Sequence, residues 1–389
     1  TDRQTKAAVA SISTQPPYAE DWPRDGAYFN ILLNLAGSTD IARERNYFYE
    51  KVQSKEPEGW IPAGTWRMNF YSDGMVGGPW DFEIDQVGFV IWSWATHLLS
   101  EPNKSEFIKN IYPAFKLSVE EVLINCKDDR NLQCLAYEDD NIEPSITIVG
   151  SSMVYAGLFH AQKIAETAGD TDLLSKIRKR MKELETAMLQ NYANENGFIS
   201  PTPTEMEQGL AYLLFPANFP MKTEWVIKYG EQLTNVLNFN FNKRGFLLYE
   251  AKWIISLIVA SEILKGKNQS YSEMFKSEAE KYLRILTEEV PTKTFHYGEI
   301  TRYKDEKDGK LYENRIAMPH VWEATLICLT SIALREPETL EIMGVDLKVY
   351  EESKEGQKKK TICSSTGFIS SLFLLIPYLI YFYPGSRLR

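Results

Sequence analysis

The chain has 389 residues, of which 44% are hydrophobic and 25% charged, so it is long enough to bury a large core in one or two domains. Its 53 acidic and 43 basic residues give a formal net charge of −10, and no basic stretch is interleaved with aromatic side chains. The sequence therefore indicates no nucleic-acid partner. Aromatic residues make up 13% of the chain, a content that suits a core or a surface that stacks on sugar rings.

No pattern typical of a cofactor or metal site is present. The 4 His are scattered, no Cys and His cluster has metal-ligand spacing, and neither a GxGxxG nor a P-loop pattern occurs. Cys126 and Cys134 are near enough in sequence to be bridged in an oxidising compartment, and two free thiols are equally compatible with the spacing. We therefore expect no metal and no cofactor, and leave the disulfide open.

Apolar periodicity predicts helices along most of the chain, whereas the alternation typical of strands is scarce, so the sequence indicates an all-α protein. About twelve helices are expected from this periodicity. Their approximate boundaries are 4–13, 25–36, 39–53, 84–100, 104–125, 147–168, 170–191, 203–213, 220–236, 249–265, 271–288 and 319–335.

These helices alternate between two compositions. A helix such as 84–100 is apolar on most faces, whereas a helix such as 170–191 has one apolar stripe and a charged face. A helix that is apolar all round is buried, and a helix with a single stripe covers it from outside. The alternation predicts a two-layer toroid of helical hairpins, six inner and six outer, which is an (α/α)6 barrel.

Polar and aromatic segments precede the second helix of each predicted pair. The first is Trp22-Pro23-Arg24-Asp25-Gly26, in which Pro23 sets a turn and Asp25 is expected to cap the following helix. In a closed barrel of hairpins these segments lie at one end, so one rim would collect Trp, Arg, Asp and Glu side chains. The other segments are 77–85, 137–141, 200–204, 249–253 and 296–299.

The residues of this rim favour acid–base chemistry on a sugar, because carboxylates and aromatic rings are abundant and no Ser/His/Asp or Cys/His set is apparent. Hydrolysis of a glycosidic bond needs one protonated carboxyl group and one carboxylate. Glu138 is the candidate acid, because Asp139 and Asp140 disfavour its ionisation and Tyr137 partly excludes water. Glu299 is the candidate base. Each is also compatible with a solvated loop, and the competing carboxylates are Asp81, Glu83, Asp85 and Glu143.

The C-terminal part differs in composition from the rest. Residues 336–360 are polar and rich in Lys and Glu, and residues 368–383 are almost unbroken apolar and aromatic, with two arginines after them. We expect a barrel domain over 1–345, a polar stalk or linker over 346–367 and a membrane anchor over 368–389. Terminal arginines on the cytoplasmic side would place the main domain at the cell surface or outside the cell.

Four segments resemble motifs of glycoside hydrolase family 15, which contains the glucoamylases and glucodextranases. Trp22-Pro-Arg-Asp-Gly-Ala-Tyr is similar to the substrate-binding motif early in that catalytic domain. Trp80-Asp-Phe-Glu-Ile-Asp-Gln-Val-Gly is similar to the loop with its Asp-Gln or Asp-Glu pair. Tyr137-Glu-Asp with Ser145-Ile-Thr resembles the segment that carries the general acid, and Pro319-His-Val-Trp-Glu-Ala resembles the opening of the last barrel helix.

The resemblance implies an (α/α)6 barrel and an exo-acting, inverting hydrolase that releases glucose from non-reducing ends of α-glucans. It also implies that Arg24 and Asp25 bind the innermost sugar, that Glu138 is the acid and that Glu299 is the base. The other side chains that we expect to contact an oligosaccharide lie on the same rim. They are Trp22, Trp80, Asp85, Tyr137, Asp139, Glu250, Trp253 and Trp322.

Two other functions remain open from the sequence. The first is the same reaction on trehalose or dextran, which nothing in the sequence separates from hydrolysis of α-glucans. The second is a non-catalytic glycan-binding surface protein that keeps the barrel. It stays open because Tyr137 stands where the family usually has Trp, and because Glu299 lies in Gly-Glu-Ile where the family has Ser-Glu-Gln.

Overall fold

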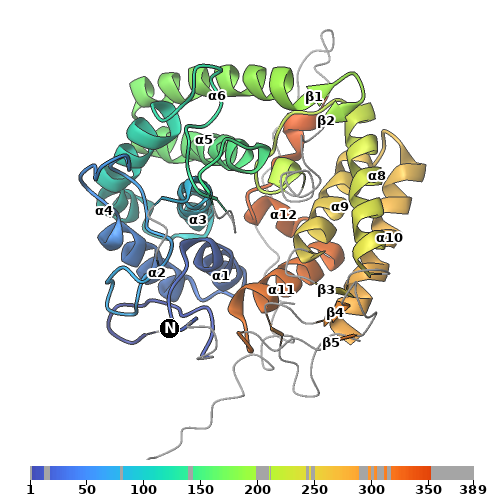
Figure 1. The fold of residues 1–389 in the computed structure, drawn as a ribbon, viewed down its shortest axis with the longest axis horizontal. Coiled ribbons are helices and arrows are strands. Elements are labelled where there is room, and N and C mark those ends of the chain that lie inside the picture. The colour runs from blue at the N-terminus through green and yellow to red at the C-terminus, as the bar shows by residue number, and fades with distance from the viewer. Residues whose placement is uncertain are drawn as a thin grey trace, which may run out of the picture.

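A ring of helices makes up most of the computed structural model (Figure 1). The structure describes residues 2–12, 18–78, 82–138, 143–198, 210, 212–241, 245–246, 250–288, 297–298, 302–304, 311–312 and 317–351. Within these residues the predominantly helical fold and the toroidal arrangement agree with the prediction from the sequence.

The inner layer of the ring consists of helices that are apolar on most faces. Within the described residues, α1 contacts both α3 and α11, α3 contacts α5, and α9 contacts α11. Every residue of the third helix from Ile84 to Leu98 is buried, as expected for a helix without a charged face. The inner helices are α1 (Pro23–Leu35), α3 (Ile84–Ser100), α5 (Ile148–Ala168), α9 (Glu250–Leu264) and α11 (Val321–Arg335).

The outer layer covers these helices with amphipathic ones. Helix α2 packs on α1 and α3, α6 packs on α5, and α10 packs on α9 and α11. Helix α4 continues into a π-helical segment, η1 (Ser118–Ile124). The outer helices are α2 (Thr39–Val52), α4 (Lys104–Leu117), α6 (Thr171–Tyr192), α8 (Thr223–Phe239) and α10 (Gln269–Glu288).

The described residues also include short β-strands. β1 (Ala193–Asn194) and β2 (Gly197–Phe198) form an antiparallel hairpin after α6. β3 (Gly245–Phe246), β4 (Arg302–Lys304) and β5 (Leu311–Tyr312) form an antiparallel sheet in the order β3-β4-β5.

Local sequence explains where two of the inner helices begin. Pro23 occupies the first turn of α1, where its missing N–H costs nothing. Asp25 therefore lies within the first turn, and the prediction that it is the N-cap residue is wrong, because the helix starts two residues earlier. The Thr147 side chain caps α5 by accepting the Gly150 N–H, and Gly169 ends α5 with a positive φ of 75°.

The helix predicted over 4–13 is wrong for the described residues 2–12, which form a turn followed by extended backbone. The Asp2 carboxylate accepts the N–H groups of Gln4 and Thr5, both at 2.8 Å, and so offers this segment an alternative to a helix. Ser11 then pairs with His320. Of the helix predicted over 203–213, the described residues 210, 212 and 213 are helical, so the six-pair count stays a prediction.

The polar stretch after α11 packs against the ring through residue Tyr350, four residues beyond the position at which the predicted stalk or linker of 346–367 begins. This stretch contains α12 (Thr339–Ile342) and η3 (Leu347–Tyr350). The carbonyl of Met343 accepts a hydrogen bond from Trp92 Nε1 of α3 at 2.8 Å. Apolar side chains between the charged ones explain this packing, since Leu340, Met343, Val345 and Tyr350 are all buried.

The remainder of the predicted linker and the predicted anchor, residues 352–389, lie outside the described residues. Among the helices that the structure describes, none combines the length and apolar character that crossing a membrane requires.

Candidate functional site

The N-terminal ends of α1, α3 and α5 meet at one end of the ring. Arg24 of α1 donates from Nε to Asp85 at 2.8 Å and from Nη2 to Glu83 at 3.2 Å, and all three side chains are buried. A parallel bridge joins Glu83 to Tyr137, the half-buried residue before Glu138. The structure therefore brings the segments of Arg24, Asp85 and Glu138 together, as the rim prediction requires.

The start of α11 closes the same end of the ring against α1. His320 Nε2 lies 3.7 Å from Asp25 Oδ2, and His320 Nδ1 is hydrogen-bonded to Glu323. The Tyr18 ring stacks on Trp22 at 5.8 Å and meets the His320 ring edge-on at 5.6 Å. Burial raises the pKa of Glu323, and the neighbouring His320 opposes this rise. A buried His flanked by two carboxyl groups thus lies directly beside the predicted sugar-binding Asp25.

The first turn of α9 contributes a buried cation. Lys252 Nζ donates to Tyr212 OH at 2.9 Å and lies 4.9 Å from the centre of the Trp322 ring. The Arg24 guanidinium lies 5.8 Å from the same ring, so two cations contact one indole. The two residues of this turn that were predicted to contact the sugar, Glu250 and Trp253, are also buried.

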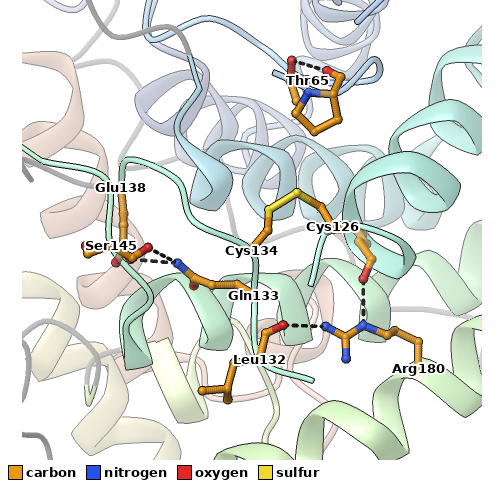
Figure 2. Close-up of a disulfide and its surroundings, with 10 residues drawn as sticks. Thr65, Cys126, Leu132, Gln133, Cys134, Glu138, Ser145 and Arg180 are labelled. Carbon is orange, nitrogen blue, oxygen red and sulfur yellow. Dashed lines mark hydrogen bonds between the residues drawn. A yellow bond between two sulfur atoms is a disulfide. The ribbon is translucent and has the colours of Figure 1, made fainter. Parts of the chain in front are cut away.

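Glu138 is fully buried and hydrogen-bonded through both carboxyl oxygens. Oε1 accepts from Gln133 Nε2 at 3.0 Å, Oε2 accepts from the Gly150 N–H at 3.1 Å, and the Thr147 hydroxyl contacts both oxygens. Figure 2 shows the Glu138 and Gln133 side chains facing one another. The carboxyl group is therefore held against the first turn of α5.

The surroundings of Glu138 favour its protonated form. Burial raises the pKa of Glu138 from the ordinary 4.5 to about 8, and the charge of Asp85 adds to the rise. The hydrogen bonds from Thr147, Gln133 and Gly150 act in the opposite direction. The sequence also predicted a disfavoured ionisation, but from Asp139, Asp140 and Tyr137, whereas the structure gives burial as the largest cause.

Three predicted site residues lie outside the described residues: Trp80, Asp139 and the candidate base Glu299. The competing carboxylate Asp81 lies outside them as well. Glu143 is described and exposed. The functional roles of all these residues stay predictions.

Several polar residues of the site were missed by sequence reasoning. Gln133 and Tyr212 belong to no motif, and only the fold brings them to Glu138 and Lys252. His320 and Glu323, three residues apart at the start of a helix, carried a detectable signal because such pairs share a helix face. Within the described residues, Trp22 Nε1, Trp322 Nε1 and Glu323 Oε1 are buried without a hydrogen-bond partner, so this end of the ring retains unused polar atoms.

Within the part of the chain that the structure describes, no group of three or more His, Cys, Asp or Glu side chains is arranged to hold a metal ion.

No protein-family model matches the chain. Over 89 residues it is 30% identical to an uncharacterized glycosyl hydrolase of Methanocaldococcus jannaschii, and this match spans 23% of the chain but 13% of the relative. The whole relative is therefore much longer than the matched segment.

Solved structures with the same fold include several glycosidases. The glucoamylase of Hormoconis resinae superposes with a TM-score of 0.66 at 13% identity, over 86% of this chain and 69% of that chain. A wild-type glycosidase superposes with a TM-score of 0.61 at 13% identity, over 85% and 92%. A cellobiose 2-epimerase of Spirochaeta thermophila reaches 0.52 at 11% identity, over 87% and 92%. The chain thus shares the toroid of glycosidases and glucoamylases, a fold that also carries an epimerase.

Proposed function

We propose that the protein is an inverting, exo-acting glycoside hydrolase that releases glucose from the non-reducing ends of α-glucans or α-gluco-oligosaccharides. The observation that carries this proposal is the buried Glu138 carboxyl group, whose pKa of about 8 keeps it protonated at neutral pH. A general acid must hold its proton at the working pH. The fold shared with glycosidases and the short match to a glycosyl hydrolase support the same class of reaction.

In this proposal Glu138 donates its proton to the glycosidic oxygen as the bond from that oxygen to the anomeric carbon breaks. Glu299 acts as the base that takes a proton from the attacking water, which adds to the opposite face of the sugar. Arg24 and Asp25 bind the innermost glucose. The partnerless indole N–H groups of Trp22 and Trp322 are donors suited to sugar hydroxyls.

The rest of the rim supplies the surface for the saccharide. The further side chains proposed to contact it are Trp80, Asp85, Tyr137, Asp139, Glu250 and Trp253. The reaction requires no cofactor in this scheme.

A glycan-binding protein without hydrolytic activity is the second candidate. It is favoured by the complete burial of Glu138, whose two oxygens already have partners in the protein. An acid that reaches a substrate must expose one of these oxygens when the sugar binds.

The two candidates are separated by glucose release from maltose, isomaltose, trehalose and malto-oligosaccharides, measured beside binding of the same sugars. Wild-type protein should release glucose, and Glu138→Gln should lose most of this activity while it still binds the sugar. The exposed Glu143→Gln variant is the matched control on the same loop and should stay active. Binding without any hydrolysis would support the second candidate, and loss of activity in Glu143→Gln alone would move the acid to Glu143.

A further inference from the structure

A hairpin closed by a disulfide lies beside the Glu138 carboxyl group (Figure 2). Cys126 and Cys134 are bridged, with their Cα atoms 5.0 Å apart, which decides the alternative that the sequence left open. The Cys134 N–H donates to the Cys126 carbonyl at 3.1 Å, and Lys127 forms an antiparallel bridge with Gln133. The residue next to the disulfide, Gln133, is therefore held by backbone pairing and by a covalent link.

A buried arginine of the outer layer donates hydrogen bonds to the same hairpin and to the residues just before it. Arg180 of α6 is 1% exposed, and its guanidinium donates to three backbone carbonyl groups at 2.9–3.2 Å. These carbonyls belong to Leu123, in η1 just before the hairpin, and to Asn131 and Leu132 within it. Because guanidinium is planar and rigid, such a set of contacts fixes the hairpin relative to α6.

Gln133 reaches from this hairpin to the proposed acid. Its Nε2 lies 3.0 Å from Glu138 Oε1 and 3.1 Å from the Ser145 carbonyl oxygen, and both are acceptors, so the orientation of the amide is determined. Its Oε1 faces the first turn of α5 so closely that a Cβ added at Gly150 would lie 1.9 Å from it. Gln133 is thus wedged between the Glu138 carboxyl group and the helix start.

We propose that Gln133 is a positioning residue for Glu138 and that the Cys126–Cys134 disulfide keeps it in place. The inference rests on the proposed hydrolase function, which it deepens. The amide N–H occupies a lone pair of Glu138 Oε1, so the acidic proton is directed away from Gln133 and the rotation of the carboxyl group is fixed. A general acid whose proton already points in one direction reacts faster, because less orientational freedom has to be lost on the way to the transition state.

The contact also lowers the pKa of Glu138, because a hydrogen bond donated to the ionised form of a carboxyl group stabilises that form. Two titratable groups on other elements act on Glu138 or respond to it. Asp85 of α3, which is paired with Arg24 of α1, raises the pKa of Glu138. Glu138 in turn raises the pKa of Tyr192 on α6.

The first test is the pH profile of kcat/KM for Gln133→Met, which keeps the side-chain length but removes the donor. We expect the basic limb to move up by about one pH unit, as befits loss of a hydrogen bond to a charged group. We also expect kcat to fall on the order of tenfold with little change in KM. Gln162→Met, a similar change on α5 where the amide contacts Phe159 and Met181, should change neither.

The second test removes the disulfide with Cys126→Ser/Cys134→Ser. This variant should move the basic limb of the pH profile in the same direction as Gln133→Met, but by a smaller amount. Gln133→Met should then shift the basic limb less in the variant without the disulfide than in the wild type. A lowered melting temperature with an unmoved basic limb in Gln133→Met would make Gln133 merely structural and overturn the proposal.

A readout without substrate separates this inference from the proposed function. Carbon NMR of the full chain with labelled Glu carboxyl groups follows the titration of Glu138, assigned by its disappearance in Glu138→Gln. The Glu138 signal should titrate about one unit higher in Gln133→Met. A protein that hydrolyses no sugar but shows this shift refutes the hydrolase and keeps the positioning role. An unshifted titration overturns the positioning role whatever the activity.

Discussion

Gly88 of α3 and Met153 of α5 bring two inner helices into backbone contact. A Cβ added at Gly88 would lie 2.2 Å from the Met153 carbonyl oxygen, closer than any side-chain carbon can approach. On the other side of the contact, a Cβ added at Gly157 would lie 3.1 Å from Gly88 Cα. Because α3 carries Asp85 and α5 is capped by Thr147, which contacts Glu138, this close approach sets the spacing of the proposed site.

Gly88→Ala tests this packing. Helix propensity alone favours Ala over Gly by about 1 kcal/mol, so an exposed position would gain stability. Here the backbone clash should dominate, and we expect the free energy of unfolding to fall by about 2 kcal/mol. Urea denaturation followed by circular dichroism measures the change, and an increase in stability would show that the two helices are farther apart than described.

Glu138→Gln should change how stability depends on pH. Between the ordinary pKa of 4.5 and the raised pKa of about 8, the folded protein keeps a proton that the unfolded chain has lost, so stability falls as pH rises. The variant lacks this penalty. Its unfolding free energy relative to wild type should rise by up to about 1.4 kcal/mol per pH unit in this window. Denaturation at several pH values measures the slope, with the exposed Glu143→Gln as control, and a flat difference would contradict the raised pKa.

Arg24→Met should destabilise the protein strongly at neutral pH. The substitution leaves Glu83 and Asp85 buried without their cation, which costs about 3 kcal/mol.

A matched control for Arg24→Met is Arg178→Met, which breaks the exposed ion pair with Glu166. This control should lower the free energy of unfolding by about 0.5 kcal/mol. Equal losses in the two variants, measured by denaturation at pH 7, would show that the Arg24 pairs contribute no more than a surface contact.

The C-terminal residues carry a separate prediction from the sequence. We expect the full-length chain to partition into the detergent phase of a cloud-point extraction, because residues 368–383 are almost entirely apolar and aromatic. Removal of residues 363–389 should shift the protein to the aqueous phase. Aqueous partitioning of the full-length chain would rule out the proposed anchor and with it the proposed cell-surface location.

The helices were predictable because their apolar periodicity is a local property of the sequence. Segments whose conformation depends on distant partners were not. Residues 2–12 form a turn and then extended backbone, and Ser11 near the end of this segment pairs with His320, far along the chain. Residues 336–351 pack on the ring because Met343 and Gly344 accept hydrogen bonds from Trp92 and Asn218 on other elements. No window of sequence around either segment contains those partners.

The gathering of polar segments at one end of the ring was predictable to a similar degree. The rim followed from the position of polar segments before the inner helices, and Glu138 stood out as a carboxyl group in an unusual stretch. The causes of its raised pKa did not follow, because burial and the approach of Asp85 arise only when α3 and α5 pack together. Gln133 was missed for the same reason. A glutamine next to a cysteine gives no sign in the sequence of a contact with Glu138, and only the folded hairpin with its disulfide shows the hydrogen bond.

The most direct test of the proposed mechanism is the anomer released in the first turnovers, read by proton NMR on an α-linked substrate such as maltose. An inverting enzyme has its two carboxyl groups roughly 6.5–9.5 Å apart, with room for a water opposite the leaving group. With Glu138 as acid and a water activated on the opposite face, β-glucose should appear first and α-glucose only later, by mutarotation. Early α-glucose would contradict the inverting mechanism and the roles proposed for Glu138 and Glu299.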